Sequence, residues 1–253
     1  MMDDMAVVKN PGKRFNMKFR AANLFLILVS MVFLVSCFSS DDQSEIAKTP
    51  WDAYNRAVTA SKHPAAADIY RNLSPVSAAN TKLIWNANDP AENRRVLVST
   101  WASWPGYSQN KKIGLVREVW VTLAPEVKDI LKKENVPGSN IILRIDQLLG
   151  MPPTKSETWF VELWARPADL FRPAKDPEID DTEAGLDFPA GTPQAHIDWY
   201  NDQVKTNTYP WTRLGYTYDW GNPATKVGLS EYIIRVSSEV EVNKVALTMD
   251  YLN

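Results

Sequence analysis

The side chains best suited to chemistry are few in this chain of 253 residues. It contains one cysteine, Cys37, and two histidines, His63 and His196. A single cysteine can form neither an internal disulfide nor a cysteine-rich zinc site, and two distant histidines could hold zinc only together with a carboxylate. The sequence has no Gly-x-Ser-x-Gly elbow, phosphate-binding loop or dinucleotide glycine fingerprint, so no familiar catalytic motif is present.

Paired carboxylates are the second kind of chemistry that the sequence allows. Glycoside hydrolysis uses an acid and a second carboxylate several ångströms apart. Carboxylates in or beside expected strands or the aromatic loop described below are Glu157, Glu162, Asp219 and Glu231. Their separation does not follow from the sequence, and charged residues at strand edges are commonly only solvated. A glycan hydrolase therefore stays an alternative function.

An acidic run has part of the spacing of a calcium-binding loop. Asp176, Glu178, Asp180 and Asp187 occupy relative positions 1, 3, 5 and 12 of such a loop. However, Asp181 stands where the loop needs glycine, and position 12 is an aspartate rather than the longer glutamate. We therefore expect a solvated acidic loop and no metal site.

Two charged residues, Asp169 and Arg172, follow the expected strand 158–164 closely. Opposite charges three residues apart can form a local ion pair. We expect that structural role for Arg172 rather than the binding of an anion.

Seven aromatic residues fall within the 22 residues from Trp199 to Trp220. Interspersed proline and glycine indicate a rigid loop that could present ring faces to a sugar or a peptide, with polar side chains nearby for directional hydrogen bonds. The alternatives are that the rings pack the loop onto a sheet, as most aromatic residues do, or that part of the stretch is a strand with one buried face. The candidate ligand-binding residues are Trp211, Arg213, Tyr218, Asp219 and Trp220.

The first 37 residues have the pattern of an export signal. Five basic residues precede an apolar run of 12 residues, 24–35, and Ser36 directly precedes Cys37. A spanning helix needs roughly 20 apolar residues, so this run is typical of a signal peptide rather than of a permanent anchor. Met17, directly before Lys18, is an alternative start of the chain.

Residues 17–37, which end in Leu34-Val35-Ser36-Cys37, resemble the signal peptide and lipobox of bacterial lipoproteins. The resemblance implies cleavage before Cys37, a diacylglyceryl thioether on its sulfur and often acylation of the new amino group. Two or three acyl chains hold a protein durably, because each buried CH₂ contributes about 0.8 kcal/mol. Phe38, which is not an aspartate, implies the outer membrane in a Gram-negative host. The alternatives are a secretory signal before a free cysteine and a short uncleaved anchor.

The charge of the chain bears on its partners. The formal charge is −2, of which residues 1–36 contribute +3, so −5 remains for residues 37–253. This acidity argues against a nucleic-acid partner and against electrostatic attraction to anionic lipid. The expected membrane contact is therefore the lipid on Cys37.

The pattern of elements predicts one α+β domain over residues 49–253, after a signal peptide (1–36) and a lipidated cysteine with a flexible tether (37–48). Helices are expected to open at Thr49-Pro50, Ala124-Pro125 and Thr192-Pro193, with a short helical turn at 146–149. The sheet should be mostly antiparallel, with about three inserted helices and with 158–164 placed centrally. The expected strands are 96–101, 118–123, 141–143, 158–164, 232–236 and 240–247.

Together these patterns favour a non-catalytic lipoprotein of the cell envelope that binds a protein or a cell-wall glycan and uses no cofactor. The alternatives are the glycan hydrolase above and a structural accessory subunit of an envelope complex. The sequence alone does not identify the ligand or the partner.

Overall fold

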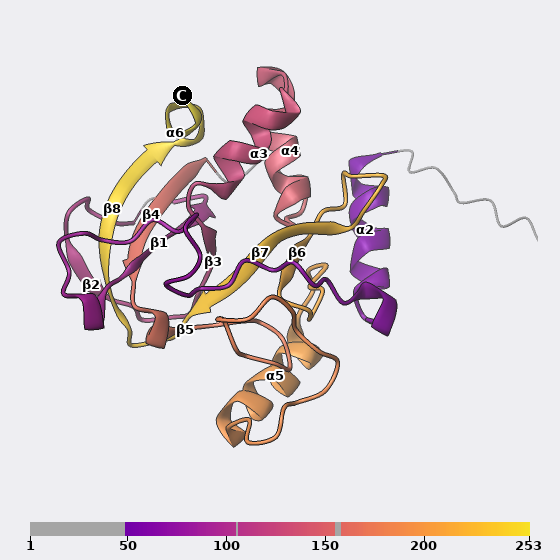
Figure 1. The fold of residues 1–253 in the computed structure, drawn as a ribbon. Helices are drawn as coiled ribbons and strands as arrows, with labels where there is room; N and C mark the ends of the chain where they lie inside the picture. The colour runs from indigo at the N-terminus through magenta and orange to yellow at the C-terminus, as the bar shows by residue number, and fades with distance from the viewer. Residues whose placement is uncertain (1–48, 105, 155–157) are drawn as a thin grey trace, which may run out of the picture. The chain divides into compact units, whose positions relative to one another are not determined.

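An eight-stranded antiparallel sheet is the centre of the domain (Figure 1). The computed structural model describes residues 49–104, 106–154 and 158–253. The strand order is β2-β8-β4-β1-β3-β7-β5, and β6 pairs with β7 beside this path. The strands are β1 (Val96–Ala102), β2 (Lys112–Gly114), β3 (Val119–Leu123), β4 (Trp159–Ala165), β5 (Leu170–Phe171), β6 (Tyr216–Tyr218), β7 (Val227–Ile234) and β8 (Glu239–Leu247).

The predicted α+β class with a mostly antiparallel sheet is confirmed. Strand β4, expected to be central, lies inside the sheet between β8 and β1. The short strands β2 and β5 were not predicted, because two or three residues carry too little pattern to be recognised.

The helices are α2 (Pro50–Ala60), α3 (Glu126–Glu134), α4 (Ile141–Leu148), α5 (Gln194–Thr206) and α6 (Thr248–Leu252). The three expected helix starts are confirmed. Helix α2 begins with a capping box, in which Thr49 accepts from the backbone N–H of Asp52 and the Asp52 carboxylate accepts from that of Thr49.

The prediction of a strand at 141–143 is wrong, because these residues open helix α4. Ile141, Ile145 and Leu148 lie three or four residues apart and pack on one side of that helix against the core. A run of three apolar residues does not distinguish a strand from a helix, and the helical periodicity extends into the turn expected at 146–149.

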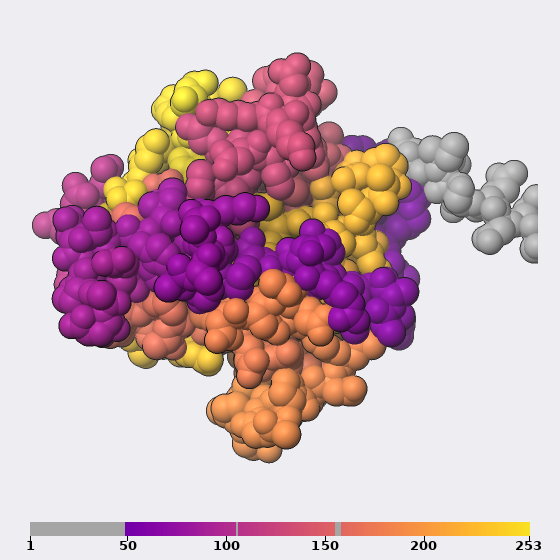
Figure 2. Space-filling view, in the orientation of Figure 1, coloured from indigo at the N-terminus to yellow at the C-terminus, as the bar shows by residue number. Residues whose placement is uncertain are grey.

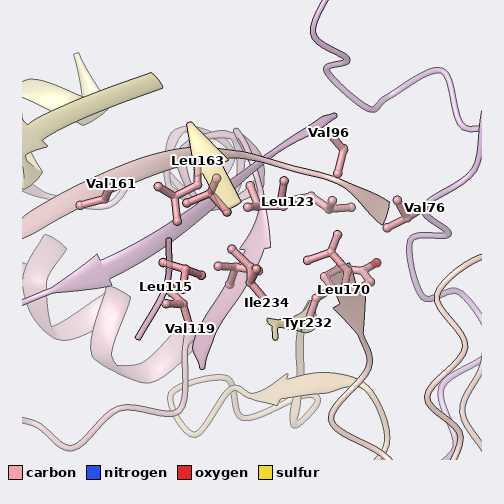
Figure 3. Close-up of a cluster of buried hydrophobic side chains, with 14 of the residues drawn as sticks. Val76, Val96, Leu115, Val119, Leu123, Val161, Leu163, Leu170, Tyr232 and Ile234 are labelled. Atoms are coloured by element: carbon pink, nitrogen blue, oxygen red, sulfur yellow. The ribbon is translucent and has the colours of Figure 1, made fainter. Parts of the chain in front are cut away.

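One face of the sheet carries an aliphatic core (Figure 3). Strict alternation puts Val96 and Val98 of β1 beside Val161 and Leu163 of β4 on this face, all of them fully buried. The long segment between α2 and β1, drawn in purple, runs over the domain in Figure 2 and contributes Val76 to this core. Close packing of aliphatic side chains here makes the sheet a rigid support for its other face.

The other face of the sheet carries aromatic and polar side chains. Trp101 of β1 and Phe160 of β4 pack there against Ile145 and Leu148 of α4 and Tyr251 of α6, and the Phe160 and Tyr251 rings stack at 4.4 Å. Helices α3, α4 and α6 lie together at one end of the domain, whereas α5 lies at the opposite end (Figure 1).

The loop after β5 is anchored by the buried side chain of Arg172. The Arg172 side chain is fully buried, donates to the Asp181 carboxylate and donates to the Glu183 carbonyl at 3.1 Å. The predicted pair between Asp169 and Arg172 is therefore wrong, because Asp169 accepts from Arg166 at 2.7 Å instead. The acidic run is thus anchored to the sheet by a buried cation, a partner that only the tertiary fold brings to it.

Candidate functional site

A cavity of about 500 Å³ opens on the aromatic and polar face of the sheet. Strands β1, β3 and β7 form its floor, and the loops 149–151 and 207–211 form its walls. Its size lies within the roughly 300–1,000 Å³ typical of small-molecule sites. The aromatic residues that line it are Trp101, Trp104, Tyr107, Trp120, Phe160, Tyr209, Trp211 and Tyr218.

The aromatic walls are fixed by contacts among themselves. The rings of Trp120 and Trp211 meet edge to face at 6.2 Å, and Trp211 in turn contacts Trp199 of α5 at 6.1 Å. The indole N–H of Trp211 donates to the Pro173 carbonyl at 2.7 Å. Rings held in this way present a preformed surface, so a ligand would lose little free energy to their ordering.

Two of the cavity's rings are exposed to solvent. Trp104 is 69% exposed and Tyr209 46% exposed, although both line the cavity. Gly106, with φ +49°, lies under the Trp104 ring, and a Cβ at Gly106 would come within 2.2 Å of that ring. Glycine at this position therefore lets the Trp104 ring approach the backbone closely.

The floor of the cavity includes a row of polar residues that crosses the sheet. Strand register places Ser99 opposite Thr122, and Thr122 opposite Glu231. The hydroxyl oxygens of Ser99 and Thr122 lie 3.4 Å apart. The flanking β7 residue Tyr232 points to the aliphatic core on the other face, so the period of two directs Glu231 into the cavity.

Glu231 is the distinctive group of this floor. Its carboxyl has neither a hydrogen bond nor an ion pair with any residue that the structure describes, while its side chain keeps partial exposure through the cavity. Burial in the protein raises the pKa of Glu231 to about 8. At pH 7 the empty site therefore holds mainly the neutral acid, which can donate a hydrogen bond.

Of the carboxylates considered for glycoside hydrolysis, Glu231 is the one among the described residues that lines the cavity. Glu162 lies in the same row, but its backbone is three strand spacings away, which is about 14 Å, and its carboxylate accepts from the Asn243 amide. The Asp219 carboxylate accepts from Arg144, and Glu157 lies outside the described residues. A further carboxylate, Glu118, lines the same cavity and accepts from the Trp199 indole N–H at 2.9 Å.

Two of the five residues predicted to bind a ligand, Trp211 and Tyr218, line the cavity. Trp211 is 5% exposed, so it contributes to a deep wall rather than to an open groove. That these two residues bind a ligand stays a prediction. Their site would be the cavity rather than the exposed aromatic loop that the sequence indicated.

The other three predicted residues lie outside the cavity lining, and their polar groups contact the protein itself. Trp220 is 9% exposed and donates its indole N–H to the Met151 carbonyl at 3.0 Å. Asp219, 2% exposed, accepts twice from Arg144 at 2.7 and 2.9 Å. Arg213 donates to the Lys62 carbonyl at 3.1 Å and lies over the Trp211 ring. These three side chains hold the loop onto the domain, in line with the alternative that its aromatic residues pack it onto the sheet, and their predicted role in ligand binding stays a prediction.

Trp101 and Trp120 line the cavity but were not predicted to do so from the sequence. The expected strand 118–123 contains a pattern that indicates one of them, because Trp120 and Thr122 alternate with Val119 and Val121. This alternation shows two differently composed faces, but it does not show that helices leave part of one face uncovered.

Other titratable side chains are buried outside the cavity. Glu126 of α3 accepts from the Ser74 hydroxyl at 2.9 Å, and burial raises its pKa to about 7. His196 is buried, with its Nε2 2.8 Å from the Ala174 carbonyl oxygen, and burial lowers its pKa. Within the described ranges, no group of three or more His, Cys, Asp or Glu side chains is placed to hold a metal ion. In the same residues no helix is long and apolar enough to cross a membrane. Cys37 lies outside them.

Compared with known proteins, the chain matches no family model, no curated protein and no solved structure.

Proposed function

We propose that this protein is a lipid-anchored lipoprotein of the cell envelope whose domain binds a small ring-bearing ligand, such as a fragment of cell-wall glycan, in the aromatic cavity. The observation that carries the proposal is a preformed cavity of about 500 Å³ with ring faces on its walls and a few polar groups on its floor. Sugar rings stack on aromatic faces, and the hydroxyls of Ser99 and Thr122 and the carboxyl of Glu231 can bond to their oxygens.

A binding role is better supported than catalysis. Glu231 has the raised pKa that a general acid needs, and this favours glycan hydrolysis as the second candidate function. Hydrolysis by the usual route also needs a second carboxylate that is free to act, whereas Glu118 accepts from the Trp199 indole and Glu162 from the Asn243 amide. We therefore expect no release of reducing ends when the purified protein is incubated with peptidoglycan fragments, and such release that disappears in Glu231→Gln would support the hydrolase.

Replacing Trp120 by alanine should weaken binding to the cavity at least tenfold. The side chain lies on the floor beside Trp211, and loss of a stacking ring removes both contact area and a rigid wall. The measurement is calorimetric titration of detergent-solubilised full-length protein with N-acetylglucosamine oligomers. Trp51→Ala is the matched control, because Trp51 is 47% exposed on α2 and does not line the cavity. Equal losses in the two variants would contradict the assignment.

The proposed membrane attachment is supported by the basic segment, the short apolar run and the sequence Leu34-Val35-Ser36-Cys37. Replacing Cys37 by serine removes the thiol that would accept the lipid, so palmitate labelling should fall to background and the protein should leave the membrane fraction. Ser36→Ala, which keeps a small residue before the cysteine, should label normally. Unchanged labelling of Cys37→Ser would rule out lipidation at this residue.

A further inference from the structure

We propose that Glu231 makes the cavity selective for ligands that carry a protonated amine, as an amino sugar or a cyclic amine does. This inference rests on the proposed binding function, because it specifies the chemistry of the ligand at the same site. It follows from the carboxyl's isolation, from the aromatic rings that line the same cavity and from the positions of the other charged groups.

The Glu231 carboxyl lacks a partner among the residues that the structure describes. Its neighbours in the polar row do have partners, since the hydroxyl oxygens of Ser99 and Thr122 lie 3.4 Å apart. Glu162, in the same row, accepts from the Asn243 amide at 2.6 Å. Buried ionisable groups without partners are costly and therefore uncommon unless they serve a function. A ligand that supplies a cation would remove this cost.

The lining of the cavity is rich in aromatic rings. Trp101, Trp120 and Tyr218 line the same cavity as Glu231. The faces of aromatic rings attract cations, and aromatic cages are the usual way in which proteins bind ammonium groups. A carboxylate in the same cavity adds a full opposite charge, so a cation gains from both kinds of group.

The charged groups that line the cavity also favour a cation. Among the described residues, the titratable groups that line it besides Glu231 are Tyr107, Arg117, Glu118, Tyr209 and Tyr218. Arg117, the cation among them, is exposed and precedes strand β3. Glu118 accepts from the Trp199 indole N–H at 2.9 Å and would repel an anion entering the cavity. The cavity therefore favours cations over anions.

Binding of an ammonium ion requires Glu231 to give up its proton to solvent, while the ligand keeps its own. The affinity should therefore rise as the pH rises towards the pKa of Glu231, which burial sets at about 8, and level off above it. A neutral sugar that accepts a hydrogen bond from the protonated acid should show the opposite dependence. The two chemistries thus differ in the sign of their response to pH.

The test compares two probes of nearly the same shape, cyclohexylammonium and cyclohexanol, by calorimetry on detergent-solubilised full-length protein at pH 6 and pH 8. We expect cyclohexylammonium to bind at least tenfold more tightly at pH 8 than at pH 6, with release of protons to the buffer, and cyclohexanol to show no such gain. Glu231→Gln keeps the shape and a hydrogen-bond donor, so it should lower cyclohexylammonium affinity at pH 8 at least tenfold and change cyclohexanol affinity less than about twofold. Glu92→Gln, at an exposed position outside the cavity, is the matched control.

The outcomes separate the inference from the proposed function. Equal binding of both probes, or equal binding by the wild type and Glu231→Gln, would overturn the amine selectivity and leave the cavity as a binding site. Failure of both probes and of N-acetylglucosamine oligomers to bind would overturn both. Tighter binding of cyclohexanol than of cyclohexylammonium at both pH values would show that the acid form serves a neutral ligand instead.

Discussion

Replacing Arg172 by methionine is expected to destabilise the domain by about 3 kcal/mol, because it removes the hydrogen bonds that a fully buried cation donates to the loop after β5. The guanidinium is fully buried and ties β5 to the acidic loop through the Asp181 carboxylate and the carbonyls of Asp181 and Glu183. Methionine fills much of the volume but bonds to none of these groups. For a domain of this size the midpoint of thermal unfolding should fall by roughly 10 °C, measured by circular dichroism on full-length protein.

The matched control is Arg166→Met. Arg166 forms the same kind of pair with Asp169, but its side chain is 50% exposed, so its loss should cost less than about 1 kcal/mol. Similar melting curves for the two variants would contradict the view that Arg172 holds the loop from inside.

Replacing Glu231 by glutamine is expected to stabilise the domain at alkaline pH. In the unfolded chain a glutamate loses its proton near pH 4.5, whereas the pKa of Glu231 in the folded domain is about 8. Between these values the folded state binds more protons, so the wild type loses stability as the pH rises from about 4.5 to 8. Glutamine removes this loss. The full difference in pKa would correspond to about 5 kcal/mol, and water in the cavity reduces it, so we expect a gain of about 2–3 kcal/mol at pH 8.5.

The pH dependence distinguishes this effect from a general change in packing. Glu231→Gln and wild type should have the same stability below about pH 4, and the gain should develop as the pH rises, measured by denaturant unfolding at several pH values. Glu92→Gln should show no such trend. A gain of the same size at pH 4 and pH 8.5 would contradict the raised pKa. A variant that becomes more stable while losing ligand affinity is typical of a residue kept for function.

The sequence predicted the framework of the domain because its main elements have strong local signals. Thr49-Pro50 and the capping carboxylate of Asp52 specify the start of α2 without help from the rest of the chain. Strands β1 and β4 are dense in β-branched and aromatic residues, and they lie where expected inside the sheet. Local signals failed at 141–143, where a short apolar run fits two structures equally well.

The site was less predictable because it depends on contacts distant in sequence. Trp220 and Asp219 were predicted to bind a ligand because they lie in the aromatic loop. In the fold, Trp220 packs against Tyr54 and donates to the Met151 carbonyl. The Asp219 carboxylate accepts from Arg144. Glu231 was only one of four candidate carboxylates. Its isolation follows from strand register and from the partial cover of one sheet face, neither of which can be derived from local composition.

The most direct test of this account is a crystal structure of the full-length protein with saturating cyclohexylammonium at pH 8. The account predicts density for the ring in the cavity, against Trp120 and Tyr218, with the nitrogen within hydrogen-bonding distance of the Glu231 carboxylate. Density for the ligand only on the outer surface of the 199–220 loop, or an empty cavity at saturation, would contradict it.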